Sequence, residues 1–172
     1  MTEKKMSRRS FLKWSAITGA AAITTYVVVK VSENQGDEEQ HTLMSRLKGV
    51  PLTDPPENPN AWAYEAGTLF VTLSDVPELN APGSAVRIEG EVLTDPILVV
   101  HGGDDQYYAY LNVCTHGGRM IDPVAGTLTL ECCSASQSTF DYEGNVLSGP
   151  AESPLTTYPV EVDAGQLVIG LG

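Results

Sequence analysis

The chain has 172 residues, which is enough for one ordinary domain plus a targeting segment but not for two domains of usual size. Its formal net charge is -12, and after residue 13 only 5 basic residues accompany 21 acidic ones. A surface this acidic repels phosphate groups, so we do not expect nucleic acid as a partner. The three cysteines are too few for a disulfide scaffold and point to a local site instead.

The N-terminus carries an export signal. Residues 7–13 read Ser-Arg-Arg-Ser-Phe-Leu-Lys, and paired arginines followed by apolar residues and a lysine are typical of a twin-arginine signal. We assign residues 1–13 to the basic region of this signal and expect the rest of the chain to be exported.

An apolar stretch follows at residues 14–32. Its apolar part, residues 14–31, would span about 27 Å as a helix rising about 1.5 Å per residue, just enough for the hydrocarbon core of a bilayer. No small-residue cleavage site comes after it. We predict one N-terminal transmembrane helix that anchors the protein in the cell membrane, with the basic end in the cytoplasm and the C-terminal domain on the extracytoplasmic side.

Two further regions differ in composition. Residues 33–62 are rich in acidic residues, amides and proline, which cannot build a core, so they are predicted to be a linker. Residues 63–172 alternate short apolar runs with turn residues, the pattern of an all-β domain. The predicted strands are 68–73, 85–89, 97–100, 107–113, 128–131, 138–141, 157–162 and 167–169.

Two short segments of this domain hold the candidate site. Residues 114–119 read Cys-Thr-His-Gly-Gly-Arg, and residues 133–141 read Cys-Ser-Ala-Ser-Gln-Ser-Thr-Phe-Asp. Thiols and imidazoles are the donors that bind zinc or an iron–sulfur cluster. The sequence contains no motif for a nucleophile with its base or for a phosphate loop, so no catalytic residue is predicted.

Both segments resemble the loops of the Rieske iron–sulfur family. The first resembles the family's Cys-Thr-His-x-Gly-Cys, the second its Cys-Pro-Cys-His-Gly-Ser-x-Phe-Asp, and residues 144–151, Gly-Asn-Val-Leu-Ser-Gly-Pro-Ala, resemble its closing segment. The resemblance extends from about Gly67 to the C-terminus. It implies a Rieske-type antiparallel β sandwich or barrel with a small cluster-binding subdomain.

The resemblance also implies a [2Fe–2S] cluster, in which two thiolates hold one iron and two imidazoles hold the other. Carried over residue by residue, Cys114 and Cys133 match the thiolate ligands and His116 matches the first imidazole. Ser136 stands where the second imidazole belongs and is the candidate for the fourth position. Because that imidazole contacts quinol in cytochrome bc-type complexes of the family, we do not expect direct quinol oxidation.

Three other residues depart from the family pattern. Arg119 and Ala135 occupy the two positions of the family's loop disulfide, and we expect Arg119 to tie the loop through hydrogen bonds. Cys132 directly precedes Cys133, and neighbours on a strand point to opposite faces. It is interpreted as a small buried residue, with a substitute ligand as the alternative.

The resemblance implies an electron-transfer subunit of a membrane-associated oxidoreductase complex, whose partners are other subunits of that complex and a cytochrome-like acceptor. The alternative is a cluster-free structural or docking subunit. In that case an empty, exported site should contain a disulfide from Cys114 to Cys133, or to Cys132 if the loop shifts. A third hypothesis is a mononuclear metal such as zinc at Cys114, His116 and Cys133.

Overall fold

The computed structural model describes Leu43, residues 47–103 and residues 105–172. The predicted signal at residues 1–13 and transmembrane helix at residues 14–32 lie outside the described residues. No helix in the part that is described is long and apolar enough to cross a membrane. The β domain lies within the second of two compact units, Met44–Gly172.

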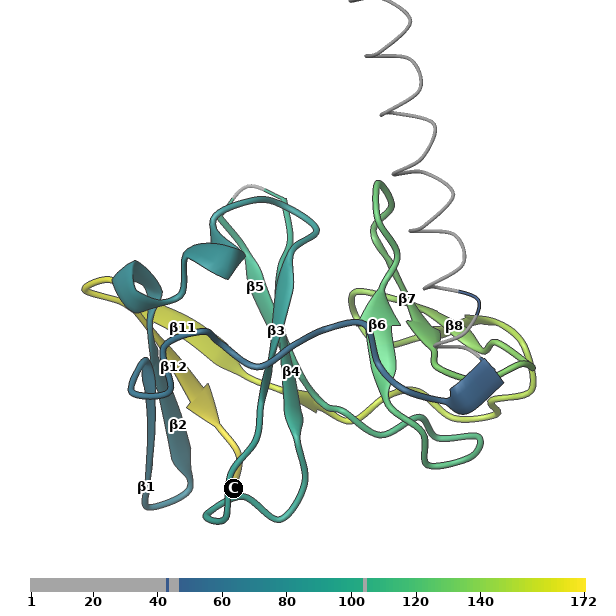
Figure 1. Cartoon of the computed structure of the whole chain (residues 1–172), viewed down its shortest axis with the longest axis horizontal. Coiled ribbons are helices and arrows are strands. Elements are labelled where there is room, and N and C mark those ends of the chain that lie inside the picture. Colours follow the sequence, from purple (N-terminus) through teal and green to yellow (C-terminus); the bar gives the residue numbers. More distant parts are fainter. Residues whose placement is uncertain (1–42, 44–46, 104) are drawn as a thin grey trace, which may run out of the picture. The chain divides into compact units, whose positions relative to one another are not determined.

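Within the described residues, twelve short strands form three antiparallel four-stranded sheets. The first sheet has the order β1-β2-β12-β11, the second β10-β5-β4-β3 and the third β6-β7-β8-β9 (Figure 1). The strands are β1 (Trp62–Glu65), β2 (Thr68–Thr72), β3 (Ala85–Ile88), β4 (Ile97–His101), β5 (Tyr107–Leu111), β6 (Ile121–Pro123), β7 (Thr129–Cys132), β8 (Thr139–Asp141), β9 (Val146–Ser148), β10 (Thr157–Tyr158), β11 (Val160–Asp163) and β12 (Gln166–Gly170). Two 3₁₀ turns, η1 (Leu73–Asp75) and η2 (Pro77–Leu79), follow β2.

The second sheet contributes to two hydrophobic cores. All five residues of β4 are buried, and their side chains alternate between the two faces of the sheet. Ile97 and Val99 pack into a core shared with the first sheet, while Leu98 and Val100 pack into a core shared with the third. A strand covered on both faces explains why this stretch is an unbroken apolar run.

The structure confirms the all-β class and refines the predicted strands. β1, β6 and β9 were not predicted, because the last two have only three residues each and β1 directly follows proline-rich sequence. The predicted strand at 157–162 is two strands, β10 and β11, separated by Pro159. Proline has no N–H to donate to a neighbouring strand, so the ladder is interrupted there.

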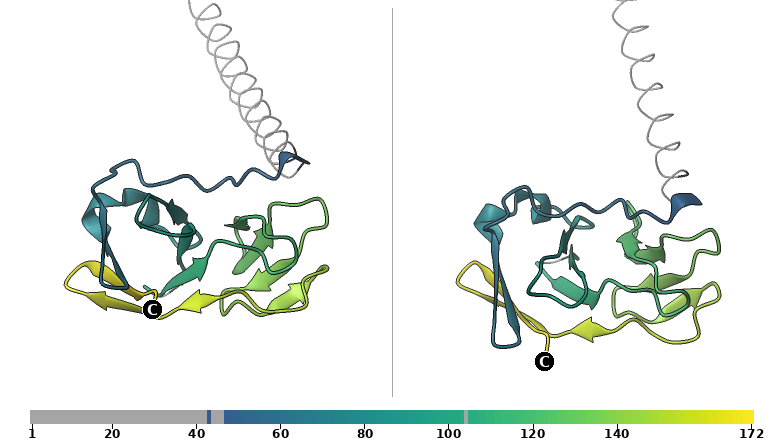
Figure 2. Two further views of the ribbon diagram at one scale, coloured as in Figure 1. Left: turned by 90° about the horizontal axis from the view of Figure 1, so that it is seen from below. Right: turned by 60° about the horizontal axis from the view of Figure 1, so that its bottom comes forward.

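Part of the predicted linker at residues 33–62 is bound to the β domain. We call residues 52–57 the strap, because this extended segment runs past the second and third sheets (Figures 1 and 2). The backbone N–H of Arg87 in β3 donates to the carbonyl of Asp54 at 3.0 Å, and its guanidinium donates to the carbonyl of Thr53 at 2.6 Å. The strap's backbone groups thus find partners in the β domain, as groups removed from water must.

Candidate functional site

Two loops connect strands at one end of the third sheet and carry all the predicted site residues. The first loop, residues 112–120, joins β5 to β6, and the second, residues 133–138, joins β7 to β8. The backbone N–H of Cys133 donates to the carbonyl of Met120 at 2.9 Å, which holds the two loops side by side.

The first loop is a tight turn around Cys114. The N–H of Cys114 donates to the carbonyl of Arg119 at 2.6 Å, and the N–H of Gly118 donates back to the carbonyl of Cys114 at 2.9 Å. Gly118 has φ +68°, a left-handed conformation that glycine adopts without steric cost. The Thr115 hydroxyl donates to the carbonyl of Ser153 at 2.7 Å, so the chain just after the closing segment holds the loop in place.

The three cysteines face two different environments. Cys132 ends β7 and packs in the second core together with Cys114. The thiol of Cys133 instead donates to Oδ2 of Asp122 at 2.9 Å. The resemblance paired Cys133 with Cys114, whereas the structure places Cys132 beside Cys114. All three are free thiols.

Burial keeps two of these thiols protonated at neutral pH. Loss of solvation raises the pKa of Cys132 to about 11, with the Ser134 hydrogen bond acting in the opposite direction. Burial also raises the pKa of Cys133, and the Asp122 carboxylate adds to the shift because it favours the neutral thiol. A metal bonds to the thiolate, so loading this site requires these protons to leave.

The predicted nitrogen and oxygen donors lie at the surface. His116 and Ser136 are both exposed, each at the outer part of its loop. The Ser136 hydroxyl is 3.3 Å from the hydroxyl of Ser134, within its own loop. Among the described residues, no three His, Cys, Asp or Glu side chains are grouped so as to hold a metal ion.

Arg119, at one of the two positions of the family's disulfide, links the loops by a hydrogen bond instead. Arg119 donates from Nη1 to the carbonyl of Cys133 at 3.4 Å, a long hydrogen bond that links the first loop to the second. The same guanidinium lies against Gly49, where an added Cβ would collide with it. Ala135 is exposed. Arg119 therefore connects both loops and the segment before the strap.

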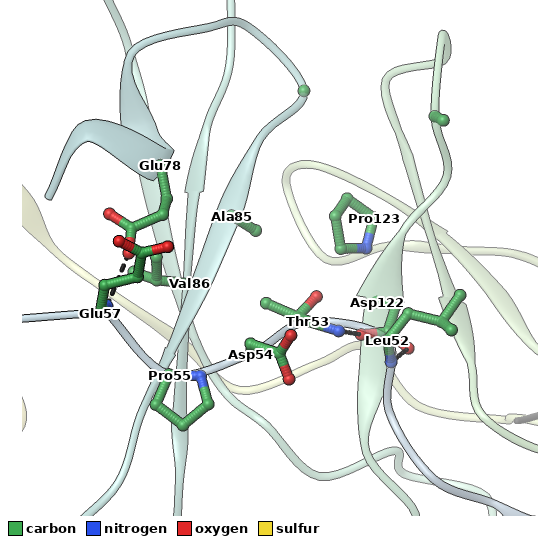
Figure 3. Close-up of a pocket in the computed structure, with 12 residues that line it drawn as sticks. Leu52, Thr53, Asp54, Pro55, Glu57, Glu78, Ala85, Val86, Asp122 and Pro123 are labelled. Atoms are coloured by element: carbon green, nitrogen blue, oxygen red, sulfur yellow. Dashed lines mark hydrogen bonds between the residues drawn. The ribbon is translucent and has the colours of Figure 1, made fainter.

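Asp122 is the residue of this region that sequence reasoning missed. It lies in β6, is only 4% exposed, and accepts hydrogen bonds from the N–H groups of Leu52 at 2.8 Å and Thr53 at 2.9 Å (Figure 3). The Cys133 thiol is its third donor. The sequence did contain a signal for it, because the aspartate stands in a short apolar run between Ile121 and a proline. Such a run is expected to be buried, and a buried carboxylate needs hydrogen-bond partners.

Ser138, at the end of the second loop, holds that loop through buried hydrogen bonds. It is fully buried, and its hydroxyl accepts a hydrogen bond from the N–H of Ala151 at 3.0 Å. The N–H of Cys132 donates to the carbonyl of Ser138 at 2.9 Å. The end of the closing segment, at Ala151, therefore contacts the second loop through Ser138, and Ser153 just after it contacts the first loop through Thr115.

Comparison with known proteins identifies a family domain and an export signal in this chain. The Rieske [2Fe-2S] domain matches residues 70–159, and the TAT (twin-arginine translocation) pathway signal sequence matches residues 5–25. The ferredoxin subunit of 3-phenylpropionate/cinnamic acid dioxygenase from Escherichia coli (strain K12) is 34% identical over 101 residues, which cover 58% of this chain and 88% of the relative. The same subunit from Shigella flexneri gives the same values.

Solved structures with the same kind of domain are also similar. The plasma membrane Rieske protein PetC3 from the cyanobacterium Synechocystis PCC 6803 is 26% identical with a TM-score of 0.46, covering 54% of this chain and 91% of that one. The ferredoxin of carbazole 1,9a-dioxygenase from Nocardioides aromaticivorans IC177 is 26% identical with a TM-score of 0.46, covering 55% and 93%. With both loops, the closing segment and 90 matched residues in agreement, this chain belongs to the Rieske [2Fe-2S] domain family and carries a twin-arginine export signal.

Proposed function

We propose that this chain is a Rieske-type electron-transfer subunit of a membrane-associated oxidoreductase complex on the extracytoplasmic side. One observation carries the proposal. The thiols of Cys114 and Cys133 are buried, at 1% and 4% exposure, while His116 and Ser136 are exposed on the same two loops. This order, sulfur inside and nitrogen or oxygen outside, is what a cluster with an inner thiolate-bound iron and an outer imidazole-bound iron requires.

The residues present fit such a cluster in their chemistry, with one substitution. Cys114, Cys133 and His116 would hold it, and Ser136 would take the fourth position. When bound, a Rieske cluster takes up and releases one electron at a time. Serine presents a short and normally protonated hydroxyl where the family presents a neutral imidazole, so we expect a ligand set that differs from the family's.

The surrounding residues exclude water and hold protons. The second core buries Cys114, and Asp122 keeps the Cys133 thiol as a hydrogen-bond donor until its proton leaves. To join Cys114 on one iron, the Cys133 thiol would have to leave Asp122 and the chain would have to turn at Cys133, where its N–H is bonded to Met120. Asp122 would keep its two strap donors. The Thr115 hydroxyl anchors the first loop to the carbonyl of Ser153.

The relatives support the redox role and leave the partner open. The relatives from Escherichia coli and Shigella flexneri are ferredoxin subunits of a dioxygenase, which supports electron transfer for this chain as well. As partners we propose other subunits of a membrane redox complex and a cytochrome-like acceptor. The net charge of -12 favours a partner with a basic docking surface.

The test is to express the full chain with its own export signal and purify it in mild detergent. Iron and acid-labile sulfide are then measured, and a paramagnetic resonance spectrum is recorded after reduction with dithionite. We expect about two irons and two sulfides per chain, with the signal of a reduced [2Fe–2S] cluster. Protein that contains no iron, even when isolated together with its partners, would overturn the proposal.

A matched pair of histidine variants tests the assignment. His116→Ala removes an exposed side chain, so it should leave the fold intact and abolish or shift the resonance signal. His41→Ala changes a histidine outside the β domain and should leave the signal as in the unaltered protein. Equal signals from both variants would show that His116 is not a ligand.

A second candidate function is a cluster-free docking subunit of such a complex. The hydrogen bond from Cys133 to Asp122 favours it, because that thiol already has a buried partner and is held protonated. The side chain of Ser136 likewise has a partner in its own loop. Iron-free protein that nevertheless co-purifies with other membrane subunits would support this function over the first.

A further inference from the structure

The three cysteines are separated by the alternation of β7. Side chains on a strand point to opposite faces in turn, and Cys132 is on the inner face with Leu130. Cys114 is part of the same core, and the Cys132 thiol interacts with it there. Cys133 is one residue further and faces Asp122.

The pairing of β6 with β7 fixes this division. Ile121 lies opposite Cys132, and Asp122 lies opposite Glu131, in an antiparallel register. Cys133 is two residues beyond Glu131, so it shares the face of Asp122 and meets it diagonally. Turning Cys133 toward Cys114 would require the chain to twist where its N–H is bonded to Met120.

We infer that Cys114 and Cys132 form a disulfide in the exported protein when no metal is bound, and that Cys133 stays a free thiol on Asp122. This pairing is independent of the proposed function. It links Cys114 to Cys132, whereas the family motif brings Cys114 together with Cys133 as a second ligand. A Cys114 sulfur held in this bond is not available as a thiolate ligand, so the disulfide and a metal exclude each other.

The chemistry is a thiol–disulfide exchange. The oxidant is the disulfide of a dithiol oxidase in the compartment that receives the protein. One thiol of the pair loses its proton and attacks that disulfide, which gives a mixed disulfide and releases one thiol of the oxidant. The second thiol loses its proton and displaces the other oxidant sulfur, so the protein gains one S–S bond and the oxidant gains two electrons and two protons.

The experiment uses the full chain purified from membranes. Any iron is removed with a chelator in the presence of a thiol reductant, and its absence is checked by metal analysis. The protein is then equilibrated with oxidised glutathione, and the remaining thiols are alkylated under denaturing conditions. After cleavage at glutamate residues, which include Glu131, fragmentation mass spectrometry identifies the linked and the alkylated cysteines.

We expect one alkylated cysteine, Cys133, and a linkage between Cys114 and Cys132. Two variants make the result decisive. Cys133→Ser keeps a hydroxyl that can donate to Asp122 and should retain the disulfide, leaving no thiol to alkylate. Cys132→Ala keeps a small apolar side chain in the core and should lose the disulfide, leaving two thiols. Circular dichroism confirms that each variant is folded.

The inference is overturned if the linkage joins Cys114 to Cys133, or if all three thiols are alkylated in the oxidised, iron-free protein. The proposed function is tested separately, by the iron, the sulfide and the resonance signal of protein that has not been treated with chelator. The disulfide experiment can therefore succeed or fail whether or not the untreated protein contains a cluster.

Discussion

Asp122 connects the candidate site to the segment that leads toward the N-terminus. Its carboxylate accepts from two strap N–H groups and from the Cys133 thiol, so one side chain touches both the site and the strap. Hydrogen bonds to a buried carboxylate are stronger than neutral ones. Leaving buried donors without a partner costs more than the bonds contribute.

The first prediction concerns Asp122→Asn. The substitution keeps one acceptor oxygen but removes the charge and turns an NH₂ group toward backbone donors. We expect the free energy of unfolding to fall by about 2–3 kcal/mol, from the usual strength of hydrogen bonds to charged groups. Urea denaturation followed by circular dichroism measures the change, and limited proteolysis should show faster cleavage in the strap.

Asp163→Asn is the control for this variant. Asp163 is exposed at the end of β11, so its substitution should change stability by no more than about 0.5 kcal/mol. If both aspartates gave the same small change, the strap would not depend on Asp122 for its position.

Tyr110 gives a prediction about pH. It is fully buried in β5, and its hydroxyl donates to the carbonyl of Tyr142 at 2.5 Å. Burial raises its pKa well above the ordinary value for tyrosine, which is about 10. Because the unfolded chain ionises first, this tyrosine stabilises the fold fully below pH 10, and the stabilisation is lost as pH rises above that value.

Tyr110→Phe tests this dependence. It removes the hydrogen bond to Tyr142, so at pH 7 to 9 the variant should be less stable by a constant amount of about 1–3 kcal/mol. Above pH 10 the difference in unfolding free energy between the two proteins should shrink, by up to about 1.4 kcal/mol per pH unit. Only the unaltered protein has the Tyr110 hydroxyl, so only it loses stability through the ionisation of this group. Urea titrations across this pH range measure the gap, and a constant gap would contradict the assignment.

At the scale of elements, the closing segment positions the second loop. Gly149 has φ +89°, and a Cβ there would lie 2.5 Å from Cα of Ser138 and 2.6 Å from the carbonyl oxygen of Gln137. Only glycine therefore allows the chain to pass this close to the loop. The passage lets the N–H of Ala151 reach the Ser138 hydroxyl.

The prediction for this element is that Gly149→Ala destabilises the protein by about 2–4 kcal/mol, from overpacking and from the left-handed conformation together. The atoms it meets belong to backbone, which cannot move aside as a flexible side chain would. Gly117→Ala, in the first loop, is the matched control, since no heavy atom lies within 4 Å of its added Cβ. Thermal unfolding should separate the two variants clearly.

The sequence predicts the longer elements well and the direction of individual side chains poorly. Ile97 to Val100 is an unbroken apolar run, and it became the strand buried on both faces. β6 was missed because three residues carry too little periodicity to be recognised. The partner of Cys114 also could not be read from the motif, because it depends on which face of β7 each cysteine occupies, and that follows from pairing with β6.

At the scale of the whole molecule, the three-sheet arrangement explains where the site lies. The second core, shared by the second and third sheets, includes Cys114 and Cys132. The thiols are therefore embedded in apolar packing, while the tips of their loops remain at the surface. Such a site is sheltered from solvent but lies close to the surface.

The last prediction concerns export and anchoring, which the twin-arginine match at residues 5–25 makes testable. Arg8→Lys combined with Arg9→Lys keeps the charge but removes the paired arginines that the export pathway reads. The unaltered chain should appear in the membrane fraction, resist extraction with carbonate and be cut by protease added to spheroplasts. The double variant should remain in the cytoplasm, protected from the protease.

Its thiols provide a second readout in the same cells. The cytoplasm keeps cysteines reduced, whereas the compartment beyond the membrane favours disulfides. Alkylation of iron-free protein should therefore modify all three cysteines in the double variant and only Cys133 in the exported chain. A chain released by carbonate and shortened at its N-terminus would contradict the anchor while leaving export intact, because a cleaved signal still delivers the β domain to the oxidising side.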